Sequence, residues 1–281
     1  MLANDELGDR MKDYEARNQY FLQRRTPVAI RVDMKSGHSF TKGFQRPFDE
    51  IFVKSIQQTA KFMCENIQGA VLSFQQSDEI TIILQDYKNL NTDAWFNYRT
   101  DKMCSISASM ATMAFNKFFE KNVNDWISKN APTFHEAWGN LEDEKLYHTY
   151  LKILEKGAMF DARCFNIPKE EVCNLIYWRQ LDATRNSIQM AGQANFSHKK
   201  LQNKSCNMIQ EMLFSEKGIN WNDYPTYLKR GSCCIKTTIQ NPNVDIKDGV
   251  YPKSVWMIDL DIPIFKGDGR QYIDKLIYVG E

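Results

Sequence analysis

Two stretches decide the fold: TPVAIRVDMKSGHSF at residues 26–40 and VLSFQQSDEITIIL at residues 71–84. In the first, apolar residues fill every second position behind a proline, and this pattern predicts a buried strand that ends at Asp33. In the second, apolar residues run up to Phe74, a polar tip follows at residues 75–79, and an isoleucine-rich segment leads away. This order predicts a β-hairpin.

Acidic residues stand at the end of the predicted strand (Asp33) and at the tip of the hairpin (Asp78 and Glu79). Carboxylates that meet in a dry site raise one another's pKa unless a cation neutralises them. Mg²⁺ prefers a few carboxylates together with substrate phosphates, and two such ions about 4 Å apart can hold both oxygens of a phosphoryl displacement. The pattern is typical of a polymerase palm. Spacing alone leaves a second interpretation open, in which Asp33 caps a turn and the acidic tip only solubilises a hairpin.

The composition is that of a globular protein. The chain has 281 residues, enough for one large domain or two small ones, with 43% hydrophobic and 25% charged residues. No apolar run approaches the roughly 20 residues that span a bilayer, and the N-terminal segment lacks the apolar core of a signal peptide. We therefore expect a cytoplasmic protein without a membrane partner. The seven cysteines include no CxxC pair, so we expect reduced thiols and no zinc site.

The net charge of +1, from 36 basic and 35 acidic residues, does not indicate a nucleic-acid-binding protein by itself. Basic residues nevertheless cluster locally, and such clusters either face phosphates or form a solvated surface. The clusters are Arg24 with Arg25, Lys35 with Lys42 and Arg46, Lys199 with Lys200 and Lys204, and Lys229 with Arg230.

Periodicity places the remaining elements around the two acidic stretches. We expect helices at 4–22, from Pro47 to Ile67, at 92–121 with Thr92 as its cap, from Pro168 through 189, and from Ser197 to Leu213, and strands at 158–167, 231–238 and 254–261. In the helix at 92–121, we expect the side chains of Met103, Ile106, Met110 and Met113 to point inward. Residues 123–157 look like a peripheral segment.

The segments RVDMKSGHSFTKGFQRPFDE (31–50) and SFQQSDEI (73–80) resemble the nucleotide-binding motifs of the tRNA-His guanylyltransferase family. These enzymes and their relatives add nucleotides to RNA in the 3′-to-5′ direction. The likeness continues through FDAR (160–163), WRQLDATRNSIQ (178–189), LFSE (213–216) and YLKRG (227–231). It implies an α+β fold whose palm-like, ferredoxin-like antiparallel sheet is flanked by helices. It also implies a catalytic core at 1–180 and a C-terminal α/β extension at 181–281 that packs on the core and contacts RNA.

The resemblance also implies which residues act. Asp33, Asp78 and Glu79 are the expected catalytic residues, and two Mg²⁺ ions are expected on Asp33, Asp78 and the backbone carbonyl of Met34. The implied substrates are tRNA and GTP or other nucleoside triphosphates, with ATP used to activate a 5′-monophosphate end, and the implied assembly is a homotetramer. The residues expected to bind nucleotide are Asp33, Met34, Lys35, Ser36, Gly37, His38, Arg46, Ser77, Asp78 and Lys102. Those expected to bind RNA are Arg24, Arg25, Arg179, Asn186, Lys199, Lys200, Lys229 and Arg230.

The chain departs from the family pattern at three places. Met34 replaces a glycine, Arg46 replaces a lysine, and residues 184–187 read Thr-Arg-Asn-Ser where the eukaryotic enzymes have His-Ile-Asn-Asn. In the last feature the chain resembles the bacterial and archaeal guanylyltransferase-like proteins, which extend truncated tRNA 5′ ends by template-dependent pairing. We therefore predict 5′-end repair of tRNA. The alternatives are a strict tRNA-His guanylyltransferase that adds a single G, a palm-type nucleotide cyclase, and a tRNA-binding protein without activity.

Overall fold

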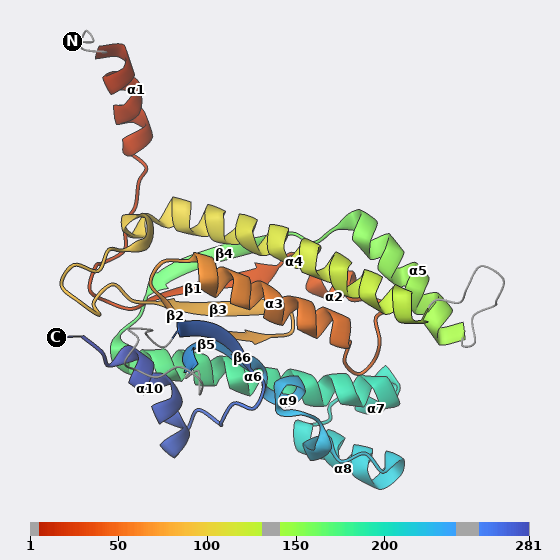
Figure 1. Cartoon of the computed structure of the whole chain (residues 1–281). Coiled ribbons are helices and arrows are strands. Elements are labelled where there is room, and N and C mark those ends of the chain that lie inside the picture. Colours follow the sequence, from red (N-terminus) through yellow and green to blue (C-terminus); the bar gives the residue numbers. More distant parts are fainter. Residues whose placement is uncertain (1–5, 131–140, 240–252, 281) are drawn as a thin grey trace, which may run out of the picture.

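The computed structural model describes residues 6–130, 141–239 and 253–280. At its centre lies a six-stranded sheet with the order β4-β1-β3-β2-β5-β6, in which every neighbouring pair is antiparallel (Figure 1). The strands are β1 (Val28–Met34), β2 (Ala70–Gln76), β3 (Glu79–Leu84), β4 (Phe160–Asn166), β5 (Ser232–Ile239) and β6 (Lys253–Asp259).

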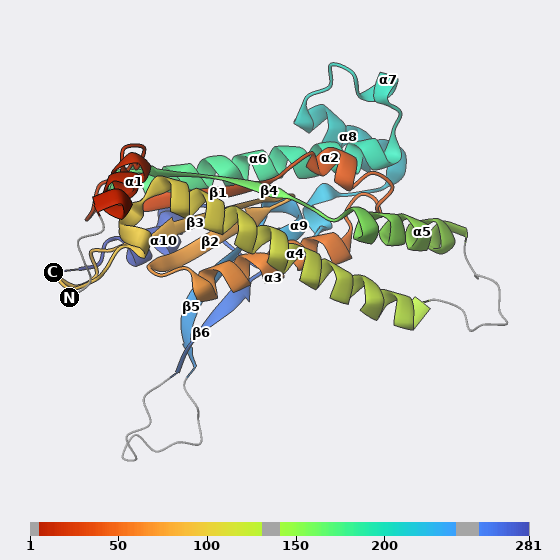
Figure 2. The ribbon, with the colours of Figure 1, turned by 90° about the horizontal axis from the view of Figure 1, so that it is seen from above.

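Helices cover both faces of this sheet, with α3 and α4 on one side and α6 and α10 on the other (Figure 1). The helix α1 stands away from the body and buries none of its residues (Figures 1 and 2). The helices are α1 (Glu6–Ala16), α2 (Gly37–Phe40), α3 (Glu50–Asn66), α4 (Thr100–Asn130), α5 (Leu141–Lys156), α6 (Lys169–Asn195), α7 (His198–Leu201), α8 (Cys206–Lys217), α9 (Thr226–Arg230) and α10 (Gln271–Ile277). Short 3₁₀ turns lie at Trp95–Tyr98, Trp221–Asp223 and Gly267–Arg270.

The chain order β1-α3-β2-β3-α4-β4 and the strand order β4-β1-β3-β2 are those of a ferredoxin-like βαββαβ unit. The predicted fold class is therefore confirmed. The strands β5 and β6 extend the same sheet on the β2 side. The expected boundary between residues 180 and 181 falls inside α6, a single helix, so the core and the C-terminal part share both a sheet and a helix.

The alternation of β1 explains why charge gathers at one end of the sheet. Val28, Ile30 and Val32 are fully buried on the face that packs against α3 and α4. Arg31 and Asp33 point to the opposite face, because successive side chains of a strand point to opposite sides. Asp33 lies directly opposite Glu79 on β3 and Asp161 on β4, so all three carboxylates share this second face.

An aromatic cluster anchors the turn that follows β1. The ring of Phe40, in α2, lies 5.8 Å from Phe44, 6.4 Å from Phe52, 5.7 Å from Phe115 and 5.8 Å from Phe119, measured between ring centroids. Phe40 is 3% exposed. The residues between Asp33 and Phe40 therefore span from a sheet strand to a fixed ring, and both ends of the turn are held.

Several helix predictions were wrong in detail. The helix expected at 92–121 runs from Thr100 to Asn130, so Thr92 does not cap it. Ile106 and Met113 are exposed, whereas Met103 is buried. The buried face of α4 runs through Met103, Ser107 and Ala111. Because serine and alanine are not strongly apolar, the sequence pattern did not indicate this face.

Two further differences concern where helices end or are interrupted. Within the described part of the helix expected at 4–22, the helix spans Glu6–Ala16 and ends before residue 22, while residues 4 and 5 lie outside the described residues. The helix expected from Ser197 to Leu213 is split into α7 and α8. Strands lie where the sequence predicted them at 158–167, 231–238 and 254–261. All seven cysteine side chains are free, as expected of reduced thiols. Across the described segments, none of the helices has the length and apolar character needed to traverse a bilayer.

We predict that Phe40→Ala lowers the free energy of unfolding by about 3–5 kcal/mol, because it removes a buried ring from a close-packed cluster. Urea unfolding followed by circular dichroism measures this loss. The matched control is Leu90→Ala, at a position 72% exposed, where a change within about 0.5 kcal/mol is expected. A Phe40→Ala variant as stable as the control would contradict the anchoring role.

Candidate active site

The end of β1 and the turn between β2 and β3 meet at one end of the sheet. The backbone N–H of Met34 donates to the carbonyl of Asp78 over 3.1 Å, and that of Lys35 donates to the carbonyl of Met159 over 2.8 Å. The hairpin turn itself consists of Ser77 and Asp78, between Gln76 and Glu79. Two acids distant in sequence, Asp33 and Asp78, are thus brought to neighbouring backbone positions.

Gly37 is required by the position of Asp78. A Cβ atom on Gly37 would lie 1.7 Å from Oδ2 of Asp78, so the carboxylate packs directly against the glycine backbone. Ser36 and Ser77, the residues that precede Gly37 and Asp78, both adopt left-handed backbone conformations, with φ of 58° and 50°. The turn at Ser36 and Gly37 and the turn at Ser77 and Asp78 therefore face each other, with the Asp78 carboxylate between them.

The electrostatics of Asp33 fit a cation site. Burial raises the pKa of Asp33, and the charges of Asp78 and Asp161 raise it further, while Arg163 and Arg31 lower it. A cation between Asp33 and Asp78 would remove this repulsion. In the described part of the chain, no three His, Cys, Asp or Glu residues form a metal-binding group. Carboxylate oxygens are the ligands that Mg²⁺ prefers, together with substrate phosphates.

Glu79 has a different environment from the other two acids. Its carboxylate is 2.7 Å from Nε of Arg179, on α6, and 3.9 Å from Nε of Arg31. Arg179 is 7% exposed and also pairs with Asp182 over 3.0 Å. Burial raises the pKa of Glu79, whereas Arg179 and Arg31 hold it down. Glu79 thus binds α6 to the hairpin that carries Asp78, and its carboxylate is engaged by two guanidinium groups.

A cavity of about 600 Å³ opens beside Asp78. One wall is apolar and comes from the segment before α3 and from α3 itself, with Phe44, Phe52 and Ile56. The opposite wall comes from α6, α9 and the start of β5. Polar side chains face the cavity from several elements; they include His38, Arg46, Gln57, Gln75, Gln76, Ser77, Asn186, Gln193 and Ser232. An apolar wall with several polar groups is the usual form of a small-ligand site.

Buried hydrogen bonds fix the floor of this cavity. The side-chain amides of Gln57 and Gln75 each donate to the hydroxyl of Ser232 over 3.1 Å. Ser232 begins β5, so the C-terminal part of the chain completes the cavity. Sequence reasoning missed these residues, because it assigned Gln75 to the polar tip of the hairpin, whereas β2 runs to Gln76 and buries Gln75. A polar side chain in such a buried position needs a partner.

The expected nucleotide-binding residues divide into those near the cavity and those away from it. Gly37, His38, Arg46, Ser77 and Asp78 line it. The amides of Gly37 and His38 have no acceptor inside α2, since the first N–H groups of a helix never do. Asp33, Met34, Lys35 and Ser36 lie in the adjoining strand end and turn.

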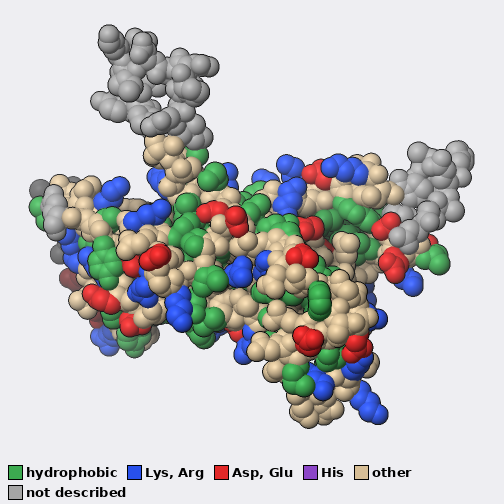
Figure 3. All heavy atoms as spheres, turned by 90° about the horizontal axis from the view of Figure 1, so that it is seen from below, with side chains coloured by type: hydrophobic (Ala, Val, Ile, Leu, Met, Phe, Trp, Pro, Cys, Tyr) green, Lys and Arg blue, Asp and Glu red, His purple; other side chains and the backbone are tan. Residues whose placement is uncertain are grey.

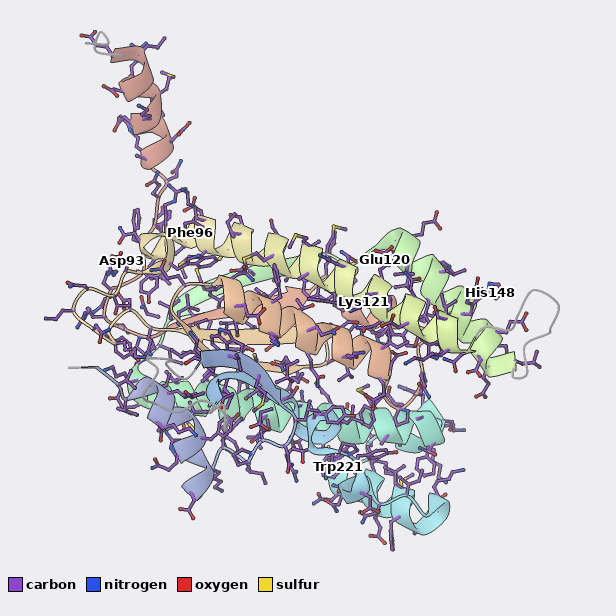
Figure 4. The ribbon with its side chains drawn as sticks, in the orientation of Figure 1. Asp93, Phe96, Glu120, Lys121, His148 and Trp221 are labelled. Carbon is purple, nitrogen blue, oxygen red and sulfur yellow. The ribbon has the colours of Figure 1, made fainter. Side chains whose placement is uncertain are left out.

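Lys102 lies far along α4 from the acids. Thr112, about 15 Å further along this helix, is the residue that contacts Phe160 beside Met34. The ammonium of Lys102 instead lies 5.8 Å from the centre of the Phe96 ring, at the end of α4 distant from α5 (Figure 4). The structure therefore does not bring Lys102 to the other expected residues.

Many of the expected RNA-binding residues are already engaged within the protein. Arg24 pairs with the fully buried Asp86 over 2.6 Å, at the end of β1 opposite to Asp33, and the backbone N–H of Arg25 donates to the same carboxylate. Arg179 is the buried partner of Glu79 described above. Lys229 is 8% exposed, and its ammonium donates to the carbonyl of Asn222.

The remaining four lie on α6, α7 and α9. Lys199 is exposed, Lys200 pairs with Glu216, and the guanidinium of Arg230 lies 5.8 Å from the ring of Trp221. Trp221 is on the side of the molecule away from Phe96 (Figure 4). Asn186 lines the cavity. Of the basic residues among these eight, Arg25 and Lys199 form no ion pair or cation–π contact within the described residues, and the guanidinium of Arg25 donates to the carbonyl of Asn89 over 3.2 Å. The RNA-binding set remains a prediction.

A family model described as tRNAHis guanylyltransferase matches residues 8–168, more than half of the chain. The chain belongs to the tRNA-His guanylyltransferase family. Membership in this family makes it a nucleotidyltransferase, consistent with the paired carboxylates beside a cavity.

Solved structures and curated sequences agree with this assignment. A bacterial tRNA(His) guanylyltransferase-like protein in complex with ATP is 36% identical, with a TM-score of 0.77 over 98% of this chain and 100% of that chain. A bacterial tRNA(His) guanylyltransferase-like protein in complex with GTP is 34% identical, with a TM-score of 0.72 over 98% of this chain and 100% of that chain. The tRNA(His) guanylyltransferase of Saccharomyces cerevisiae is 27% identical over 219 residues, covering 73% of this chain and 80% of the yeast protein.

We predict that Gly37→Ala lowers the kcat of nucleotidyl transfer at least 100-fold, which is about 3 kcal/mol in activation free energy. The reason is that the new Cβ displaces the Asp78 carboxylate. The fold should survive, since the clash is with the Asp78 side chain and not with the backbone of a neighbouring element. Steady-state kinetics and thermal unfolding measure the two quantities. Gly218→Ala is the control for kcat, which should not change, because a methyl group there meets nothing within 4 Å. Its φ of 65° makes alanine strained, so this control should lose some stability. Full activity in Gly37→Ala would contradict the packing of Asp78 on this glycine.

We predict that Arg179→Met destabilises the protein by about 3–5 kcal/mol, because it leaves the buried Glu79 without its nearest counterion. The pKa of Glu79, already raised, should rise further. The folded variant then binds a proton at Glu79 more tightly than the unfolded chain does, so the variant gains stability as pH falls. The loss of stability relative to the parent protein should therefore be larger at pH 8 than at pH 5. Urea unfolding at both pH values tests the sign.

Two further variants separate this ion pair from general damage to the fold. Adding Glu79→Gln to Arg179→Met should recover part of the lost stability, because no charge is then left buried. Arg17→Met breaks an exposed pair with Asp13 and should cost no more than about 1 kcal/mol. Equal losses for Arg17→Met and Arg179→Met would show that Glu79 does not need its partner.

Proposed function

We propose that the protein is a template-dependent 3′-to-5′ nucleotidyltransferase that repairs truncated tRNA 5′ ends. The observation that carries the proposal is the meeting of Asp33 and Asp78 beside a cavity of about 600 Å³. A cavity of this size accommodates the base and sugar of a nucleotide, and the acids stand at the end where its phosphates would lie.

In the proposed reaction, the 3′-hydroxyl of a nucleoside triphosphate attacks the activated 5′-phosphate of the RNA. A new O–P bond forms while the bond to pyrophosphate or AMP breaks, and the hydroxyl proton passes to solvent. When bound by Asp33, Asp78 and the carbonyl of Met34, Mg²⁺ would neutralise the charge that such a displacement develops. No protein nucleophile is needed, since positioning supplies much of the catalysis.

The residues of the chain have separate tasks in this proposal. The amides of Gly37 and His38, with Ser77 and Arg46, would bind the triphosphate. The apolar wall at Phe52 and Ile56 would cover the base. Glu79 acts here through Arg179, by fixing the hairpin, more than through contact with a metal. We therefore propose a positioning role for Glu79 in place of the catalytic role expected from the sequence.

The preference for repair over the addition of a single G rests on two features. Residues 184–187 read Thr-Arg-Asn-Ser, unlike the eukaryotic enzymes. The chain is also similar to a bacterial guanylyltransferase-like protein that binds ATP in one structure and GTP in another. A homotetramer in the cytoplasm, with ATP used to activate 5′-monophosphate ends, completes the proposal; the free cysteines fit a reducing compartment.

We predict that the protein extends tRNAs lacking one or two 5′ nucleotides, and that the added nucleotide pairs with the opposing base. Gel analysis of 5′ ends with each nucleoside triphosphate in turn measures this specificity. Asp78→Asn should lower the rate at least 1,000-fold, because it removes a charge needed for the cation, while leaving the fold intact. EDTA should likewise stop the reaction, and Mg²⁺ should restore it.

Three results would contradict the proposal. Addition of G to tRNA-His alone, whatever base stands opposite, would favour strict guanylyltransfer. Formation of a cyclic nucleotide without RNA would favour a cyclase. RNA binding that Asp78→Asn leaves unchanged, with no activity in the parent protein, would favour a binding protein.

A further inference from the structure

Trp178 is a large aromatic side chain that the described fold does not cover. It lies near the middle of α6 and is 51% exposed. Its ring is 4.5 Å from the guanidinium of Arg179 and 5.9 Å from that of Arg31. Arg179 is itself fixed by Glu79 and Asp182. The ring is therefore flanked by side chains that cannot easily move, while the rest of its surface faces solvent.

This exposed ring lies close to the catalytic acids. Arg31, which contacts it, is two positions before Asp33 on β1 and on the same face, a separation of roughly 7 Å along the strand. Arg163 lies opposite Arg31 on β4. The ring, the two arginines and Asp33 thus share one end of the second face of the sheet, within the span of a single nucleotide.

Two exposed guanidinium groups border the same area. Arg163, with a side chain 50% exposed, pairs with Asp161 over 3.3 Å. Arg185 lies on α6, about two turns beyond Trp178. Its side chain is 60% exposed and pairs with Asp182. The face that carries α6, α8 and α10 shows basic, acidic and apolar side chains interspersed among its described residues (Figure 3). Because Arg163 and Arg185 each have a carboxylate partner, the area around Trp178 carries little net charge.

The cavity described above approaches the acids from a different direction. It opens beside Asp78, between α3 and the later part of α6, and Trp178 does not line it. A displacement reaction needs two substrates at one centre. If the nucleoside triphosphate occupies the cavity, the RNA end has to arrive over the remaining open side, and Trp178 is the exposed aromatic residue there.

We propose that Trp178 is a stacking site for the 5′-terminal base of the acceptor RNA, with Arg163 and Arg185 contacting the adjoining phosphates. This inference rests on the proposed function and adds to it the place of the RNA end. Stacking on an aromatic ring accepts every base, which a repair enzyme needs because the terminal nucleotide differs between damaged RNAs. Each guanidinium here already has a carboxylate partner, so stacking contributes more to binding than charge does.

The test uses a 5′-truncated tRNA with 2-aminopurine as its 5′-terminal base, whose fluorescence is quenched by stacking. The parent protein should quench it on binding, and Trp178→Ala should bind this RNA about 5- to 150-fold more weakly, without quenching. Trp178→Phe should retain most of both effects. Affinity for a nucleoside triphosphate, measured without RNA, should be the same in all three proteins.

The matched control is Phe214→Ala, which removes another exposed aromatic ring (63% exposed) on α8, where no change is expected. Unaltered quenching and affinity in Trp178→Ala would overturn the stacking site. So would an equal loss in Phe214→Ala. A parent protein that quenches the terminal base through Trp178 yet adds no nucleotide would overturn the proposed repair function and leave the stacking site in place.

Discussion

The structure depends on the enforced proximity of like charges. Asp33 is fixed by its strand register, and Asp78 by a turn that closes against Gly37. Burial raises the pKa of Asp33, and the charges of Asp78 and Asp161 raise it further, so the raised pKa is a direct result of the fold. A protein that keeps such repulsion in its resting state is ready to bind cations, and binding stabilises it in return.

The remaining charges near these acids are arranged to contain the repulsion. Arg179 and Arg31 neutralise Glu79, so only Asp33 and Asp78 stay available among the three catalytic candidates. The cost of burying Arg179 is offset by two carboxylates, Glu79 and Asp182. Since Arg179 belongs to α6 and Glu79 to β3, this ion pair also joins α6 to the sheet, in addition to the apolar contacts of Val172 and Ile176. The later part of α6 then forms a wall of the cavity.

The sequence indicated the sheet and the acidic pair because strand alternation and hairpin tips leave a strong local pattern. It could not show the role of Arg179, because nothing local distinguishes an arginine that faces RNA from one that faces Glu79, a hundred residues earlier. Lys102 shows a second limit, since a position near the start of a long helix gives no measure of its distance from the acids; its contact with nucleotide stays a prediction. The stripe of α4 was misplaced because Ser107 and Ala111 are buried without being strongly apolar.

The edge strand β4 has a further consequence. A strand with only one neighbour offers unpaired backbone groups to any other extended chain, and exposed charged side chains discourage such pairing. Asp161 and Arg163 are half or more exposed on β4. A second strand paired at this edge would have to lie beside both charged side chains. The side chains that surround the acids therefore also protect the protein from aggregation.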